Sequence, residues 1–252
     1  MKHLFSPSGE QALSTVMALR PLLAFDFDGT LAPIVARPDD ARVSAAIAQQ
    51  LRQLAHLCPV AIVTGRSVAD VAPRLGFEPH FVIGNHGAED PLDTTPAQAS
   101  SSLDALRLRL AAAGPKLASA GVSIEDKRYS LALHYRLARD RKAAQGAIEA
   151  LLKTMEPGLA TFGGKCVVNV VDTLAPDKGD AVLRLVGRAG TAAAVFVGDD
   201  VNDEAVFVRA PPHWLTVRIG RDDPRSRATY FLDGHAEVAM FLGMMLNVLT
   251  SP

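Results

Sequence analysis

The sequence predicts a doubly wound parallel α/β fold that carries a smaller inserted α+β domain, and three observations lead to this prediction. Short apolar runs alternate with segments of helical periodicity, and each of these runs ends in polar residues. A stretch rich in Pro, Ser and Thr at 89–102 then opens a segment with strand-like alternation. We therefore predict a core domain of residues 1–90 and 172–252, with an inserted domain of residues 91–171.

Four apolar runs have the length and composition of strands that are buried on both faces of a parallel sheet. They are LLAF at 22–25, VAIV at 60–63, FVI at 81–83 and AAVFV at 193–197. Apolar residues recur at helical spacing between them, as in Val43, Ile47, Leu51 and Leu54. Ligands bind beyond the carboxyl ends of the strands in such sheets, so we expect the polar groups after the four runs to converge there.

The inserted segment has a different pattern. In YSLALHYR at 129–136, Leu and Tyr side chains occupy the odd positions and smaller or polar ones the even positions. This period of two predicts a strand with one buried face. Further strands are expected at 122–125 and 166–171, and helices near 103–110 and over 140–154. A segment of this length with its own helices and strands is a domain rather than a loop.

The composition excludes several classes of protein. The chain has 252 residues, with 26 Lys and Arg against 27 Asp and Glu, so it lacks the basic excess of a nucleic-acid or membrane-surface binder. Cys58 and Cys166 show no metal-ligand spacing. No apolar run is long enough to span a membrane, and the N-terminus lacks a signal-peptide pattern. We expect a cytoplasmic, monomeric protein that acts on a small molecule.

Acidic residues follow two of the predicted strands. Asp26 and Asp28 come directly after the first run, and Asp199, Asp200 and Asp203 follow the last one. Carboxylates that converge in one crevice repel each other and need a cation, and an oxygen-only ligand set favours Mg²⁺. A solvated acidic loop is the alternative for either cluster taken alone.

A hydroxyl and a lysine complete this set. Thr64 follows the second run, and Lys178 lies near the start of a predicted helix. Together with Mg²⁺ they can neutralise the charge of a transferring phosphoryl group. One carboxylate can attack phosphorus, and another two residues away can act as general acid and base. The pattern therefore predicts phosphoryl transfer.

The order of these motifs resembles that of the haloacid dehalogenase superfamily. The resemblance rests on D-x-D-x-T at 26–30, Thr64, Lys178 and GDDVND at 198–203. It implies that the core is haloacid-dehalogenase-like and Rossmann-like. From the two-domain organisation we expect the inserted domain to act as a cap that closes over the crevice.

The same resemblance implies roles for the acidic residues. Asp26 would be the nucleophile and Asp28 the general acid and base, and an Asp at the position of Asp28 is typical of phosphatases in this superfamily. Mg²⁺ would be held by the Asp26 side chain, the Asp28 carbonyl and Asp199, with support from Asp200 and Asp203.

Further motifs resemble those of trehalose-6-phosphate phosphatases. They are DFDGTLAPI, TGRS, GNHGAE, IEDKRYSLALHYR, GKCVV and PDKGDAV. The resemblance implies hydrolysis of trehalose 6-phosphate in trehalose biosynthesis, with these substrate-binding residues: Arg66, Asn85, His86, Glu125, Lys127, His134, Arg136 and Asn169. Asn169 stands where the family usually has Glu, so the resemblance leaves two alternatives here, a different sugar specificity or a lower affinity.

Alternatives stay open for several of these residues. Arg66 either binds substrate or pairs with Asp70, and His86 either contacts the sugar or stabilises its loop. His134 and Arg136 bind sugar or form a solvated strand face.

Lys127 has the opposite parity to His134 in the sequence. We therefore expect a turn or bulge near Asp126 if both side chains reach one sugar.

Two other functions fit the same motifs. One is a phosphatase for another sugar phosphate, such as sucrose 6-phosphate or a glycosyl-glycerate phosphate. The other is a sugar-phosphate sensor without activity, although such a sensor has no need of Asp28 or Lys178.

Overall fold

The structure, a computed structural model, describes residues 1–93, 101–164 and 166–251. The chain divides into one unit of residues 1–92 and 176–252 and a second unit of residues 93–175. The boundaries expected from the sequence were after residues 90 and 171. The second boundary lies further along the chain because the last strand of the inserted unit continues to Asp172. Thr173 then donates its amide hydrogen to the Gly158 carbonyl at 2.8 Å.

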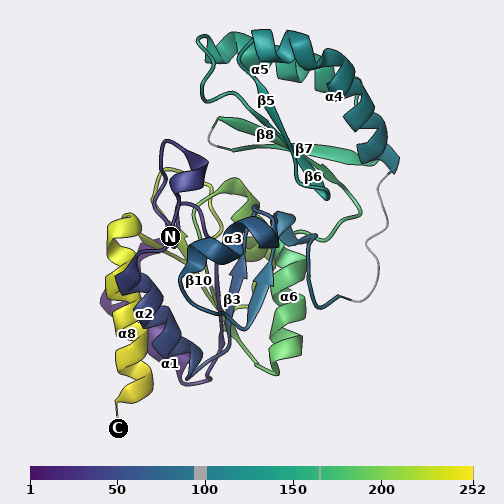
Figure 1. The fold of residues 1–252 in the computed structure, drawn as a ribbon. Helices are drawn as coiled ribbons and strands as arrows, with labels where there is room; N and C mark the ends of the chain where they lie inside the picture. The colour runs from purple at the N-terminus through teal and green to yellow at the C-terminus, as the bar shows by residue number, and fades with distance from the viewer. Residues whose placement is uncertain (94–100, 165, 252) are drawn as a thin grey trace. The chain divides into compact units, whose positions relative to one another are not determined.

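The first unit is built on a seven-stranded sheet whose strands all pair in parallel (Figure 1). The strand order is β1 (Lys2–His3), β11 (Tyr230–Leu232), β10 (Leu215–Ile219), β9 (Ala194–Gly198), β2 (Leu22–Phe25), β3 (Val60–Val63) and β4 (Phe81–Ile83). The four predicted runs are therefore the adjacent strands β9, β2, β3 and β4. The predicted parallel α/β core is confirmed.

Helices cover both faces of this sheet. They are α1 (Pro7–Met17), α2 (Ala45–Ala55), α3 (Val68–Leu75), α6 (Lys178–Ala189), α7 (Glu204–Arg209) and α8 (Val238–Thr250). The helices α1, α2 and α8 pack together at one side, whereas α6 contacts β2 and β3 from the other (Figure 1). Four 3₁₀ turns lie in the loops: η1 (Pro38–Asp40), η2 (Asn85–Gly87), η3 (Val201–Asp203) and η4 (His235–Glu237).

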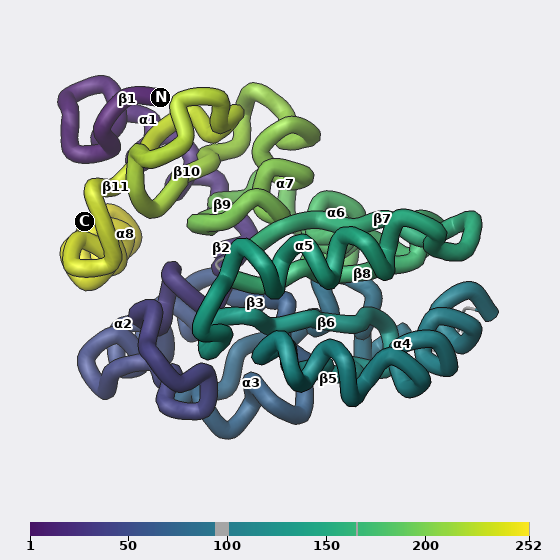
Figure 2. The backbone as a smooth tube through the Cα atoms, turned by 90° about the horizontal axis from the view of Figure 1, so that it is seen from above, coloured from purple at the N-terminus to yellow at the C-terminus, as the bar shows by residue number. Residues whose placement is uncertain are grey.

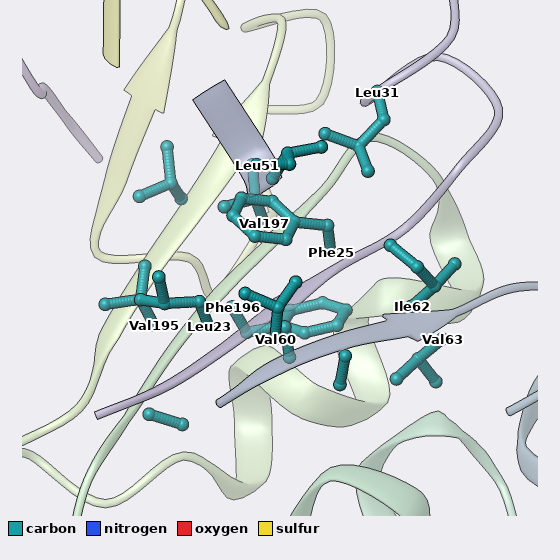
Figure 3. Packing of buried hydrophobic residues seen from close by; sticks show 14 of the residues in the cluster. Leu23, Phe25, Leu31, Leu51, Val60, Ile62, Val63, Val195, Phe196 and Val197 are labelled. Atoms are coloured by element: carbon teal, nitrogen blue, oxygen red, sulfur yellow. The ribbon is translucent and has the colours of Figure 1, made fainter. Parts of the chain in front are cut away.

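The apolar strands form the centre of the core. Every residue of β2, β3 and β9 is buried. Figure 3 shows Phe25 of β2 and Leu51 of α2 within this packing, together with Val60 and Val197 of the flanking strands. Truncating one such side chain to Ala costs about 2–5 kcal/mol, so this sheet is a rigid support for whatever follows its strand ends.

The second unit contains a four-stranded antiparallel sheet and two helices. Its strand order is β5 (Ser123–Asp126), β6 (Ser130–His134), β8 (Val167–Asp172) and β7 (Leu159–Gly164). The helices α4 (Ser101–Ser119) and α5 (Arg141–Leu152) lie along one face of the sheet (Figures 1 and 2). Leu106 and Ile148 of the helices share one apolar cluster with Leu131, Leu133 and Val170 of the strands.

The exposure expected for β6 was wrong. Leu131 and Leu133 do face the helices, but Ser130 and Ala132 are also buried, and within the strand only His134 is partly exposed. The strand lies between β5 and β8, where small side chains are shielded by their neighbours. Alternation in the sequence identified the faces of this strand correctly but not their accessibility.

Across the described parts of the chain, no helix combines the length and apolar composition that crossing a membrane requires.

Candidate active site

Asp26 follows the four buried residues of β2 at the carboxyl edge of the parallel sheet. Its amide donates a hydrogen bond to the Val197 carbonyl of β9 at 2.9 Å, and its side chain is buried. Burial raises the pKa of Asp26 well above its ordinary value, although the nearby Lys178 opposes this change. An acid placed here therefore depends on its cationic neighbour to stay ionised.

Lys178 is that neighbour and is the first residue of α6. Its Nζ lies 2.9 Å from Oδ1 of Asp26 and 2.7 Å from Oδ1 of Asp203, and its side chain is only 1% exposed. Burial alone lowers the pKa of Lys178, but the two carboxylates raise it above its ordinary value. The three side chains thus form a buried cluster of charges. Loss of any one of them would leave an uncompensated charge in the interior.

The start of α6 is stabilised by a capping box. Asp177 accepts a hydrogen bond from the Asp180 amide at 3.0 Å, and Asp180 accepts one from the Asp177 amide at 3.1 Å. Arg209 of α7 donates to both oxygens of Asp177 at 2.8 and 2.6 Å, and to Asp180 at 2.8 Å. These contacts orient the helix turn that carries Lys178. The role of Arg209 had no signal in the sequence, because it lies outside every motif.

Asp203 organises the loop after β9. Its Oδ2 accepts hydrogen bonds from the amides of Asp199 and Asp200, both at 2.9 Å, while its Oδ1 accepts from Lys178. A Cβ at Gly198 would collide with the Asp203 carboxylate, so a glycine is needed at the end of this strand. All of these hydrogen bonds to Asp203 come from groups of the protein. Asp203 therefore positions Asp199 and Lys178.

Asp26, Asp199 and Asp203 form a buried group of acids whose ligand atoms lie within 4.8 Å of one another. The Asp199 carboxylate lies against Gly29, which has φ of +82°, and a Cβ at this glycine would overlap it. Asp26 and Asp199 offer carboxylate oxygens, and the group contains no nitrogen or sulfur donor, which is the kind of ligand set that hard divalent cations prefer. These residues fit a cation of the Mg²⁺ type.

Asp28 and Asp200 lie outside this group. Both Asp28 oxygens accept hydrogen bonds from Arg66, at 2.7 and 2.8 Å, and its side chain is partly exposed. Asp200 instead accepts from the Val201 amide at 2.8 Å and caps η3. The metal-ligand roles that the sequence suggested for these two residues stay predictions.

Arg66 pairs with acids of its own unit. Besides Asp28, its guanidinium donates to Asp70 at 2.7 Å and to the Pro38 carbonyl at 2.8 Å. The partner considered from the sequence, Asp70, is therefore present, and the bidentate pair with Asp28 was not foreseen. Burial alone lowers the pKa of Arg66, but hydrogen bonds and charge from Asp28 and Asp70 raise it above its ordinary value.

Thr64, Asn85 and His86 belong to two interlocked loops after β3 and β4. The buried Thr64 accepts a hydrogen bond from the Arg66 amide at 3.2 Å, and its carbonyl accepts from the His86 amide at 2.9 Å. Asn85 donates to Glu89 at 2.7 Å, and His86 lies 3.2 Å from the Asn202 side-chain nitrogen.

Both Asn85 and His86 have positive φ, at 49° and 60°. Non-glycine residues adopt this conformation at an energetic cost, and such strain is common at functional sites. Glu89 supports the loop by accepting from the Val68 amide at 3.0 Å as well as from Asn85. Although GNHGAE contains Glu89, nothing in the motif indicated this role.

A second cluster of candidate residues lies in the inserted unit. Glu125 is 2.9 Å from Nε2 of His134 and 3.7 Å from Nζ of Lys127. Glu125 pairs with Ala132, which in turn pairs with Asn169. Arg136 lies beyond the end of β6, and its carbonyl accepts a hydrogen bond from Arg141 at 3.2 Å.

A turn or bulge was expected near Asp126 if Lys127 and His134 were to reach one sugar, and the structure has a turn there. Strands β5 and β6 form a hairpin in which the Lys127 amide donates to the Ser130 carbonyl at 3.0 Å. Odd residues of β5 therefore lie opposite even residues of β6, as Glu125 does with Ala132. The turn at 128–129 reverses the parity, so Lys127 and His134 share a face without any irregularity.

Known proteins resemble the chain in sequence and in fold. The family model described as trehalose-phosphatase matches residues 24–234. A trehalose-phosphate phosphatase from Mycobacterium marinum is 33% identical over 97% of this chain and 67% of its own length. The chain thus spans about two thirds of the length of such relatives.

Solved structures show the same fold at lower identity. The C-terminal domain of a C. albicans trehalose-6-phosphate phosphatase has a TM-score of 0.81 at 22% identity, covering 94% of this chain and 96% of that one. A haloacid dehalogenase-like hydrolase from B. subtilis has a TM-score of 0.63 at 18% identity, covering 89% and 98%.

Proposed function

The chain belongs to the trehalose-phosphatase family of phosphoric monoester hydrolases within the haloacid dehalogenase superfamily, and on this premise we propose that it hydrolyses trehalose 6-phosphate to trehalose and phosphate. In this role it completes trehalose biosynthesis. The observation that carries the proposal is the buried cluster of Asp26, Lys178 and Asp203 beside Asp199. A cluster of charges this deep is costly for stability, and it suits the stabilisation of a transferring phosphoryl group.

In the proposed mechanism, the Asp26 carboxylate attacks phosphorus and the ester oxygen of the sugar leaves. Asp28 donates a proton to this oxygen, which releases trehalose and leaves a phosphorylated Asp26. Asp28 then accepts a proton from water, whose oxygen attacks the same phosphorus and releases inorganic phosphate. Asp26 and Asp28 return to their starting states.

The surrounding residues support these two steps. Lys178 places a positive charge 2.9 Å from Asp26, and the Thr64 hydroxyl is available to a phosphoryl oxygen. Mg²⁺, held by Asp26 and Asp199, would supply further positive charge to the phosphoryl group. Arg66 binds both oxygens of Asp28 and acts as its positioning residue, and one of these oxygens has to be released from Arg66 for Asp28 to carry the proton it donates.

The inserted unit supplies the proposed sugar-binding residues Glu125, Lys127, His134, Arg136 and Asn169. Charged and amide groups of this kind discriminate well between sugars, because a missing hydroxyl leaves a polar partner unpaired. The Asn169 amide both donates and accepts hydrogen bonds, whereas a Glu at this position would only accept. The exact preference among sugar phosphates therefore depends on this position.

Phosphate release from a panel of sugar phosphates tests the proposal. We expect the highest kcat/KM for trehalose 6-phosphate, and lower values for sucrose 6-phosphate, glucose 6-phosphate and a glycosyl-glycerate phosphate. A better substrate among these three would overturn the assignment of the sugar. Activity should disappear when EDTA removes divalent ions and return when Mg²⁺ is added.

Replacing the nucleophile tests the chemistry itself. Asp26→Asn retains the shape of the side chain but cannot form the phosphorylated intermediate, so kcat should fall roughly a thousandfold or more. Circular dichroism checks that the variant is folded. Near-normal turnover in a folded Asp26→Asn protein would exclude Asp26 as the nucleophile, whereas absence of turnover in the wild type would favour a sugar-phosphate sensor.

A further inference from the structure

The four-stranded sheet of the inserted unit, formed by β5, β6, β8 and β7, is called the cap sheet below. Its face opposite α4 and α5 carries one straight row of side chains across all four strands. Glu125 of β5 pairs with Ala132 of β6, Ala132 pairs with Asn169 of β8, and Asn169 pairs with Phe162 of β7. Residues directly opposite one another in paired strands point to the same face. Three strand spacings separate the outer members of this row, which is about 14 Å.

Phe162 differs from the other apolar residues of this unit. Leu159 of the same strand belongs to the apolar cluster beneath the helices, as do Leu131 and Val170 of the neighbouring strands. Phe162 has the opposite parity to Leu159 and is not a member of that cluster. It is partly buried, and the buried amide of Asn169 is its partner in the sheet.

The chemistry of the row changes from one end to the other. Glu125 brings a carboxylate, with Lys127 and His134 beside it, whereas Phe162 brings an aromatic ring. Between them, Ala132 brings only a methyl group, and Asn169 offers a donor and an acceptor. A pyranose ring has both chemistries, because its hydroxyls lie around the rim and its C–H bonds form apolar faces. Ligand sites commonly combine an aromatic surface with a few polar groups in this way.

We propose that Phe162 is a specificity-determining residue, an apolar platform against which a pyranose ring of the substrate packs while Asn169 and Glu125 bind its hydroxyls. This inference rests on the proposed function and adds a residue that no motif of the sequence indicated. It also assigns different tasks to the two edges of the sheet. The β5 edge binds hydroxyls, and the β7 edge binds the apolar face of the sugar.

The test compares two substrates in the full-length enzyme. One is trehalose 6-phosphate, and the other is acetyl phosphate, which has no ring. For Phe162→Ala we expect kcat/KM to fall about tenfold on trehalose 6-phosphate and to change less than about twofold on acetyl phosphate. Phe162→Tyr keeps the aromatic surface and should retain most of the activity on both substrates.

Thr161→Ala is the matched control, because Thr161 lies on the same strand and points to the other face. It should leave both activities unchanged. If Phe162→Ala lowers kcat/KM equally on the two substrates, or does not lower it on trehalose 6-phosphate, the proposed role of Phe162 is overturned. A wild-type enzyme that prefers no sugar phosphate over acetyl phosphate would instead overturn the proposed function, so the two failures are distinguishable.

Discussion

Lys178 and Lys127 both pair with carboxylates, but their surroundings differ completely. The Lys178 side chain is 1% exposed, and both of its acidic partners are buried with it. The Lys127 side chain is 12% exposed, and its Nζ lies 3.7 Å from Glu125, whose side chain is 52% exposed. Water can replace a lost partner of Lys127, whereas nothing can replace one for Lys178. The Lys178 cluster of the first unit is therefore held in one arrangement, whereas Lys127 and Glu125 of the inserted unit can exchange their partners for water.

The largest effect expected from this contrast is on stability. Lys178→Met leaves Asp26 and Asp203 buried without their cation and should cost about 3–5 kcal/mol of unfolding free energy in urea titrations without metal. Lys127→Met breaks only a half-exposed pair and should cost less than about 1 kcal/mol.

Equal losses of unfolding free energy in the two variants would contradict the difference between the two lysines. Added Mg²⁺ provides a second test, because a cation bound by Asp26 and Asp199 replaces part of the positive charge that Lys178→Met removes. Mg²⁺ should therefore stabilise Lys178→Met more than it stabilises the wild type.

A smaller effect, on binding rather than on folding, is expected at Glu125. Glu125→Gln removes the charge that faces His134 and Lys127, and should raise KM for trehalose 6-phosphate about tenfold at a similar melting temperature. Asp104→Asn is the matched control, because Asp104 pairs with Arg107 on α4, at 2.6 Å and exposed. An equal KM change in the control would show that any lost ion pair of this unit has the same consequence.

The smallest effect concerns pH. Hydrogen bonds from Arg107 lower the pKa of Asp126, so this pair stabilises the fold at pH values above the ordinary Asp pKa. The contribution is lost as the pH falls through the lowered pKa of the folded state. Asp126→Asn should therefore be less stable than the wild type by under about 1 kcal/mol at pH 7, and the difference should vanish near pH 2. A difference that persists at that pH would point to packing instead.

Much of the first unit could be predicted because its signals are local. Each of four strands was indicated by a short apolar run, and parallel pairing brings the residues after them to one edge. Burial on both faces, expected for all four, was wrong for β4, which lies at the edge of the sheet and is half-buried at Phe81 and Val82. Asp26 was identified in this way and Lys178 by its place near the start of a predicted helix, and the structure places them 2.9 Å apart. Predictions from such runs need no knowledge of how distant segments pair.

The inserted unit was harder to predict because its site depends on register. Lys127 and His134 seemed to face opposite sides when their positions were counted along the chain, and the hairpin turn between them reversed that conclusion. Phe162 gave no signal either, since one aromatic residue in a strand is more often part of a core. Its place opposite Asn169 follows only from the pairing of β7 with β8.

The sequence by itself determined the parallel core, the insertion of a second unit, the acids at the strand ends and the lysine at the start of a helix. Short-range patterns carry this information, because burial and strand period are properties of neighbouring residues. Only the tertiary structure decided that Arg66 binds Asp28, that Asp203 orients Asp199, and which residues share a face of the cap sheet. Arg66 and Asp28 lie 38 residues apart, and all of these contacts depend on hydrogen-bond geometry and strand register that no local pattern encodes.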